Sequence, residues 1–203
     1  MEKLATVPAK GRPREFCVES ALAAALRVFW RRGYEGASMA ELTEEMGITK
    51  PSLYAAFGNK EALFRKALDL YEREKLAFVR SALEAPTARA VAERLLTGVY
   101  DMQTCTGDPK GCLNVISSLA CGVEAESIRE EVNLRRRSVQ KALLDRFRRA
   151  KDEGDLPEGV EPEALTVYLA TIIQGVTVQA AGGASPEQLK RIVDTTLAVW
   201  PTR

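Results

Sequence analysis

Helix boundary signals recur along this chain, and they restrict its fold more than any other feature. The Ser-x-x-Glu/Gln pattern of a capping box, in which two side chains satisfy free backbone N–H groups at a helix start, begins at Ser38, Ser127 and Ser185. Glycines follow segments with helical apolar spacing, where a helix can end with positive φ. Ala, Leu, Glu and Arg dominate, and no convincing strand or internal repeat is present. We therefore predict an all-α fold.

The same signals place about nine helices along the 203 residues. They are expected at about 15–32, 38–46, 50–56, 60–77, 87–105, 112–122, 127–154, 162–181 and 185–200. Residues 1–14 are basic and contain prolines, so we expect a flexible arm that either contacts DNA or is simply solvated. The helices then divide into an N-terminal unit, 15–66, and a larger body, 67–203.

The chain contains no histidine, which removes the commonest general base and the commonest zinc ligand. Ser-His-Asp and Cys-His catalysis are therefore excluded, whereas carboxylate or lysine chemistry is not. The four cysteines Cys17, Cys105, Cys112 and Cys121 lack paired C-x-x-C spacing, so no metal site is predicted. We expect a protein that is not an enzyme and holds no cofactor.

No segment has the pattern of an export signal or a membrane span. The first fourteen residues are polar and basic, unlike a signal peptide. The most apolar stretch, 165–181, is interrupted by threonines, glutamines and a glycine. We expect a cytoplasmic protein with reduced thiols.

Charge is distributed unevenly between the two predicted units. Residues 10–66 carry ten Lys and Arg against seven Asp and Glu, whereas residues from 67 onward carry eighteen against twenty. The N-terminal unit is therefore mildly basic and the body mildly acidic. This asymmetry favours contact with nucleic acid at the N-terminal end.

Two short predicted helices joined at Gly47 and preceded by a longer one form the pattern of a helix-turn-helix unit. In such a unit the second short helix enters the DNA major groove and presents its first side chains to base edges. Here those side chains are Thr49, Lys50, Ser52 and Tyr54. Lys can bond guanine O6 and N7, and Ser and Thr can donate or accept.

Several motifs at fixed spacing resemble the N-terminal signature of the TetR/AcrR family of transcriptional regulators. They are Gly33-Tyr-Glu-Gly-Ala-Ser-Met39, Gly47-Ile-Thr-Lys50, Ser52-Leu-Tyr-Ala-Ala-Phe57 and Asn59-Lys-Glu-Ala-Leu-Phe64. The resemblance implies that Ser38, Tyr54 and Lys60 contact phosphates, and that Thr49, Lys50, Pro51 and Ser52 face the bases. It also implies a dimer on a palindromic operator and a ligand cavity among the middle helices.

The last two predicted helices carry more apolar residues than a single helix contact needs. Two copies of the chain would bury them in a four-helix interface, an arrangement that the resemblance also implies. The alternative is that both helices close the core of one chain. The candidate interface residues are Leu165, Leu169, Ile172, Ile173, Val176, Leu189, Ile192, Val193, Leu197 and Trp200.

Cys112 follows Gly111 at a predicted helix start, where the helix dipole and free N–H groups favour a thiolate. Gly111-Cys112-Leu113 also resembles a TetR subgroup in which such a cysteine senses oxidants or electrophiles. A buried, unreactive cysteine is the alternative.

The leading hypothesis is thus a ligand-responsive regulator, in the first instance a repressor, that dimerises, binds double-stranded operator DNA and releases it on a small-molecule or thiol-reactive signal. A helical small-molecule carrier or protein-docking module without DNA binding is the second hypothesis.

Overall fold

The computed structural model describes residues 17–119, 122 and 125–201, and within them it is built from helices, without a strand. Their bounds are α1 (Val18–Gly36), α2 (Met39–Met46), α3 (Lys50–Phe57), α4 (Lys60–Lys75), α5 (Ala77–Leu83), α6 (Ala88–Thr104), α7 (Leu113–Leu119), α8 (Glu126–Asp152), α9 (Pro162–Ala181) and α10 (Pro186–Ala198). The all-α prediction is confirmed, with ten helices in place of about nine. The predicted arm at 1–14 lies outside the described residues.

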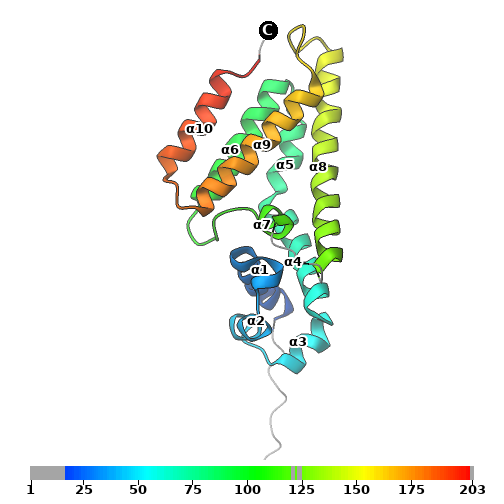
Figure 1. The fold of residues 1–203 in the computed structure, drawn as a ribbon, viewed down its shortest axis with the longest axis vertical. Coiled ribbons are helices and arrows are strands. Elements are labelled where there is room, and N and C mark those ends of the chain that lie inside the picture. Colours follow the sequence, from blue (N-terminus) through cyan, green and yellow to red (C-terminus); the bar gives the residue numbers. More distant parts are fainter. Residues whose placement is uncertain (1–16, 120–121, 123–124, 202–203) are drawn as a thin grey trace, which may run out of the picture.

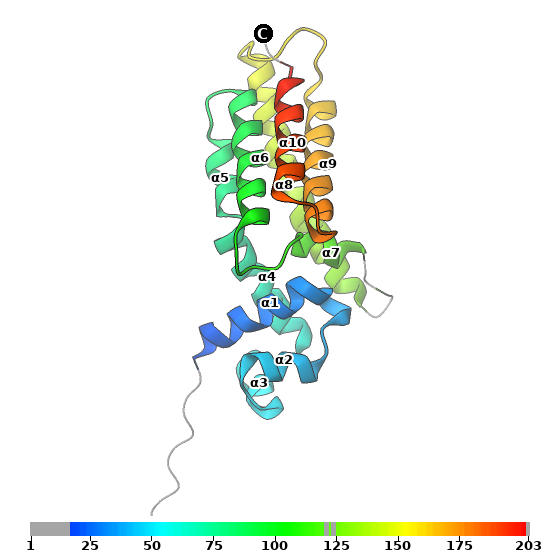
Figure 2. The same ribbon diagram turned by 90° about the vertical axis from the view of Figure 1, so that its left-hand side faces the viewer.

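The helices form two groups along the long axis of the molecule (Figures 1 and 2). At one end α1, α2 and α3 lie together against α4, whereas α5, α6, α8, α9 and α10 form a bundle that fills the other end. The short helix α7 lies between them and packs on both α1 and α8. We call the first group, with α4, the head and the second the body.

The additional helix arises from a break at Leu76, near the end of the helix that the sequence predicted over about 60–77. The Leu76 N–H reaches the Tyr71 carbonyl at 3.3 Å, one residue beyond the normal helical partner, and α5 starts anew at Ala77. This restart leaves Ala77 exposed. The restart instead directs Phe78 onto Gly98 of α6, where an added Cβ would lie 2.2 Å from the ring.

The core of the head is aromatic. Phe29 and Tyr34 of α1 both meet the Phe64 ring of α4 edge to face, at centroid distances of 5.0 and 5.1 Å. Trp30 meets Tyr71 of α4 in the same way at 4.8 Å. These contacts fix α1 across α4 and hold the two short helices in place.

The three predicted capping boxes have different outcomes. Ser185 and Gln188 form both hydrogen bonds, which confirms that box. Ser38 accepts from the Glu41 N–H at 3.0 Å, but the Glu41 carboxylate pairs with Arg32 instead of returning to the cap. The box at Ser127 was wrong, because α8 already begins at Glu126 and the Ser127 hydroxyl donates to Glu61 of α4.

Ion pairs connect the head helix α4 to the body helix α8. Glu131 of α8 accepts from Arg65 of α4 and from Arg135 on its own helix, and Arg135 also pairs with Asp69 and Glu72 of α4. Burial alone would raise the pKa of Glu131, but its two arginine partners outweigh burial and lower it. This network fixes α8, and therefore the side chains that it directs into the body, relative to α4.

Candidate nucleic-acid interface and internal pocket

The second short helix of the head presents an exposed start. Thr49 caps α3 by accepting from the Ser52 N–H, and Pro51 lies in the first turn, where its missing N–H is not needed. Thr49, Lys50 and Pro51 are exposed, whereas Leu53 and Phe57 face the head core. Because the two hydroxyls of Thr49 and Ser52 lie 3.0 Å apart, part of their hydrogen-bonding capacity is used within α3. The freest polar group at this helix start is the Lys50 amine.

The three residues predicted to contact phosphates lie on three elements, at the starts of α2 and α4 and within α3. The Ser38 oxygen accepts at the start of α2, which leaves its O–H free to donate. Tyr54 is 45% exposed, and the Lys50 amine lies 6.0 Å from its ring centroid. Lys60, at the start of α4, has its amine 4.7 Å from the Tyr34 ring centroid. Burial lowers the pKa of Lys60, and the nearby Glu35 carboxylate partly opposes this effect.

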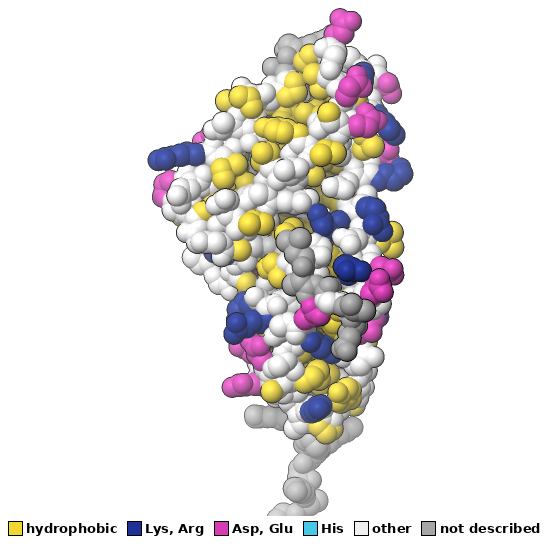
Figure 3. All heavy atoms as spheres, in the orientation of Figure 1, with side chains coloured by type: hydrophobic (Ala, Val, Ile, Leu, Met, Phe, Trp, Pro, Cys, Tyr) yellow, Lys and Arg dark blue, Asp and Glu magenta, His cyan; other side chains and the backbone are white. Residues whose placement is uncertain are grey.

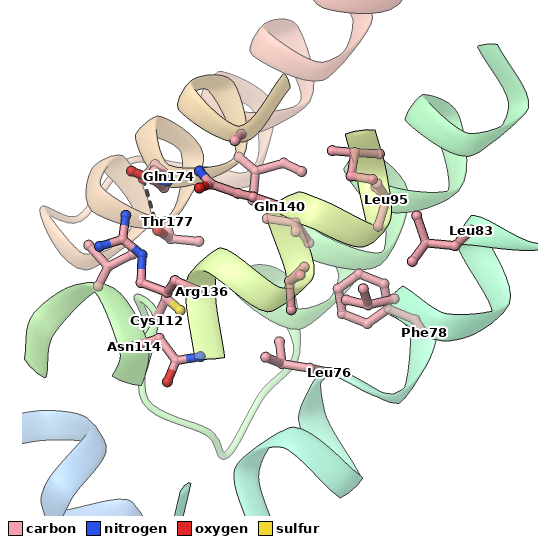
Figure 4. A pocket seen from close by; sticks show the side chains of 17 residues that line it. Leu76, Phe78, Leu83, Leu95, Cys112, Asn114, Arg136, Gln140, Gln174 and Thr177 are labelled. Carbon is pink, nitrogen blue, oxygen red and sulfur yellow. Dashed lines mark hydrogen bonds between the residues drawn. The ribbon is translucent and has the colours of Figure 1, made fainter. Parts of the chain in front are cut away.

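The body contains a pocket of about 150 Å³ between α5, α6, α8 and α9, close to the start of α7. Figure 4 shows that its two ends differ: Phe78, Leu83 and Leu95 line one end, and Arg136 and Asn114 lie at the other with Cys112, Gln174 and Thr177. Cys112 is half-buried, and the hydroxyl of the nearby buried Tyr71 donates to the Met102 sulfur at 3.9 Å. Burial, with a smaller contribution from Cys112, raises the pKa of Tyr71 well above its usual range.

One buried carbonyl, that of Gly111, joins the pocket wall to the head. Trp30 of α1 donates its Nε1–H to this oxygen at 3.1 Å, and Gln103 of α6 donates to the same oxygen at 3.1 Å. Gln103 also accepts from the Gly111 N–H at 2.7 Å. Gly111 has a φ of +93°, and an added Cβ would meet Ala181 of α9 at 3.2 Å. A head helix is thus bonded to the residue that precedes Cys112.

Six of the ten predicted interface residues face the inside of the chain itself. Leu165, Leu169, Val176, Leu189, Val193 and Trp200 are at most 6% exposed, and Ile172, Ile173, Ile192 and Leu197 are half-buried. Within one chain these six lie in the core, because α9 and α10 pack on α6 and on each other, and little of their surface is left for a second copy. The interface role of the ten residues stays a prediction.

A different stripe of α9 remains uncovered. Val167, Thr171, Gly175 and Val178 are exposed at helical spacing, and Val167 and Val178 reach 65% and 52% exposure. Among the described residues α9 is the one helix long and apolar enough to span a membrane by length and composition, and 33% of its most apolar window is buried. Figure 3 shows hydrophobic side chains gathered over α9 and α10, with charged ones along α8.

Three residues that matter here, Arg136, Asn114 and Trp30, were not among the site residues predicted from the sequence. The i, i+4 spacing of Arg136 and Gln140 would have indicated a shared helix face. Which element that face meets depends on the tertiary structure.

A helix-turn-helix head with an exposed recognition helix, carried on a helical body with an internal pocket, defines a DNA-binding regulator. The family model described as "Bacterial regulatory proteins, tetR family" matches residues 21–67. The HTH-type transcriptional repressor ComR of Escherichia coli K12 is 34% identical over 95% of this chain and 92% of its own length. BdcR, another E. coli K12 repressor, is 28% identical over 93% of this chain and 90% of its own.

A solved structure agrees with these relatives. A cysteine mutant of the TetR family transcriptional regulator CifR, complexed with 26-bp double-strand operator DNA, superimposes with a TM-score of 0.87 and is 41% identical. The match covers 94% of this chain and all of that one. The chain belongs to the TetR family of bacterial regulatory proteins, as its motifs had suggested.

The positions of Lys50 and Lys60 lead to different expected effects on DNA binding. Lys60→Ala should weaken binding to all sequences and lower the slope of log affinity against log salt by about 1, because a phosphate contact is lost. Lys50→Gln should instead change which base is preferred, since a side chain on a base edge contributes about 1–3 kcal/mol of discrimination. Mobility-shift titrations at several salt concentrations measure both effects.

Lys66→Ala, at an exposed position further along α4, is the matched control and should change neither property. If both test variants bind like the unmodified protein, these residue roles are refuted. If the unmodified protein binds no DNA, the carrier or docking hypothesis replaces that of a regulator.

Proposed function

We propose that this protein is a ligand-responsive transcriptional repressor that binds a palindromic operator as a homodimer and releases it when its body is occupied or modified. The observation that carries this proposal is the exposed start of α3, in a chain 41% identical to a protein in complex with operator DNA. In this scheme residues 15–66 read DNA and residues 67–203 dimerise and sense, and the basic segment 1–14 lies outside the described residues. The protein acts in the cytoplasm and has no catalytic role.

The uncovered stripe of α9 supports a revised dimer interface. A second copy packed on Val167, Thr171 and Val178 would remove exposed apolar surface from water. Gly175 has open space where a side chain would lie, so two helix backbones can approach closely there. Twofold symmetry then sets two recognition helices about 34–36 Å apart, the spacing of successive major grooves.

The Gly111 junction supports a route from the pocket to the head. Because Trp30 and Gln103 donate to the same carbonyl, a shift of the Cys112 backbone moves an acceptor to which α1 is bonded. Because protein interiors are close-packed, the groups that pack around this carbonyl must move when it shifts. A ligand that fills the pocket, or an adduct on Cys112, would therefore displace α1 and with it the two short helices.

Val178→Glu should convert the dimer into a monomer and lower operator affinity, because two buried carboxylates would face each other across the twofold axis. Sedimentation velocity measures the mass, and a mobility shift measures the affinity. Leu134→Glu is the matched control, since Leu134 on α8 is 62% exposed but lies outside the stripe. A Val178→Glu protein that stays dimeric would show that the interface lies elsewhere.

Cys112→Ser should abolish release of operator DNA by p-benzoquinone without changing DNA binding in its absence. The sulfur would add to a ring carbon and the thiol proton would pass to the ring system, giving a hydroquinone thioether without a further oxidant. Cys17→Ser and Cys105→Ser are matched controls, because both thiols are exposed and lie away from the pocket lining. Equal release from wild type and Cys112→Ser would refute the sensor role.

Trp30→Phe should reduce the quinone-induced loss of operator affinity while leaving the protein folded. The variant keeps an aromatic ring against Tyr71, and the Gly111 carbonyl keeps its Gln103 donor. The ratio of operator Kd with and without quinone measures the coupling. Trp200→Phe removes an indole N–H that has no partner among the described residues and should leave the ratio unchanged. Equal ratios in the two variants would exclude this route.

A further inference from the structure

We propose that the internal pocket binds a small carboxylate whose apolar part has the size of a single aromatic ring, with the carboxylate held by Arg136. This inference rests on the proposed function in one respect, namely that a ligand bound in the body controls DNA binding by the head. Its chemistry comes from the two unlike ends of the pocket (Figure 4). Each end restricts a different part of the ligand.

The volume and walls of the apolar end set the size of the ligand. The pocket has a volume of about 150 Å³, and an engineered protein cavity of this size, lined by aliphatic and aromatic residues, stays dry and binds benzene. Phe78, Leu83, Leu95 and Leu143 supply comparable walls here. Phe78 is held in place because Gly98 lets its ring lie directly on the α6 backbone. An occupant with one ring therefore fits.

Arg136 sets the charge of the ligand. Its guanidinium donates from Nη1 to Ser118 at 3.0 Å, and within the described part of the chain it makes no ion pair. The preceding residue, Arg135, has three carboxylate partners. The acidic residues near α8 therefore neutralise Arg135 and not Arg136. Among the described residues the lining includes one arginine and no Asp or Glu. A half-buried cation without a counter-ion in the described part of the chain, beside an apolar cavity, favours an anion, and a guanidinium binds a carboxylate through paired hydrogen bonds.

Asn114 supplies a polar group at the same end of the pocket. The residue is 8% exposed, and its NH2 group can donate to a carboxylate oxygen. Its Oδ1, which is buried without a hydrogen-bond partner among the described residues, is an acceptor and cannot itself bond a carboxylate.

Benzoate, benzyl alcohol and acetate test the two ends of the pocket separately. Calorimetric titration of the full chain, without DNA, should show benzoate binding at least about tenfold more tightly than benzyl alcohol, because a charge-assisted hydrogen bond is lost in the alcohol. Acetate, which lacks the ring, should bind more weakly than either. Arg136→Gln should lower benzoate affinity about tenfold or more and remove the preference for the acid.

Two further variants make the result specific. Arg137→Gln, the same substitution at the adjacent exposed residue, should bind benzoate like the wild type. Ala170→Leu fills the pocket from α9 without deleting a core side chain and should abolish binding of both aromatic probes. The proposal is overturned if neither aromatic probe binds, if benzyl alcohol binds as tightly as benzoate, or if the two arginine variants behave alike. If the protein still binds operator DNA in any of these cases, the repressor function stands. If the wild type binds no operator DNA, that function is refuted separately.

Discussion

The buried hydrogen bonds at the Gly111 carbonyl are the interaction on which the relation between head and body depends. Trp30 reaches this oxygen from the head, and Gln103 reaches it from the body. The position tolerates no side chain, since Gly111 has positive φ and lies against Ala181 of α9. Three helices from different parts of the chain therefore meet at one backbone group. Because buried polar groups must keep their partners, a displacement there cannot remain local.

Helix α8 contributes to both the fold and the pocket through adjacent residues. Arg135 faces α4 and is fixed by carboxylates, and this ion pairing helps set the position of the head relative to the body. Arg136 is rotated by one residue around the helix and lines the pocket. The ion pairs of Arg135 thus fix the helix that presents Arg136 to the pocket. A helix anchored in this way holds its backbone at a fixed place beside the pocket.

Much of the fold followed from the sequence because local rules fix helix boundaries. The stop at Gly47 and the cap at Thr49 depend on residues within one turn, and the structure confirms both. The break at Leu76 was missed, since no Gly or Pro marks it and its cause is the packing of Phe78 against α6. The Ser127 box failed for a similar reason, because Glu61 on another helix competes for its hydroxyl.

By itself the sequence determined the helix-turn-helix head and the family, because caps, turns and motif spacing are local properties of the chain. It also determined that α9 is too apolar for one contact face. Only the tertiary structure decided which of those apolar residues are core and which, such as Val167 and Val178, stay exposed. It alone brought Cys112, Asn114 and Arg136 to one pocket. These choices depend on how distant helices rotate against each other, and periodicity within one helix does not specify that rotation.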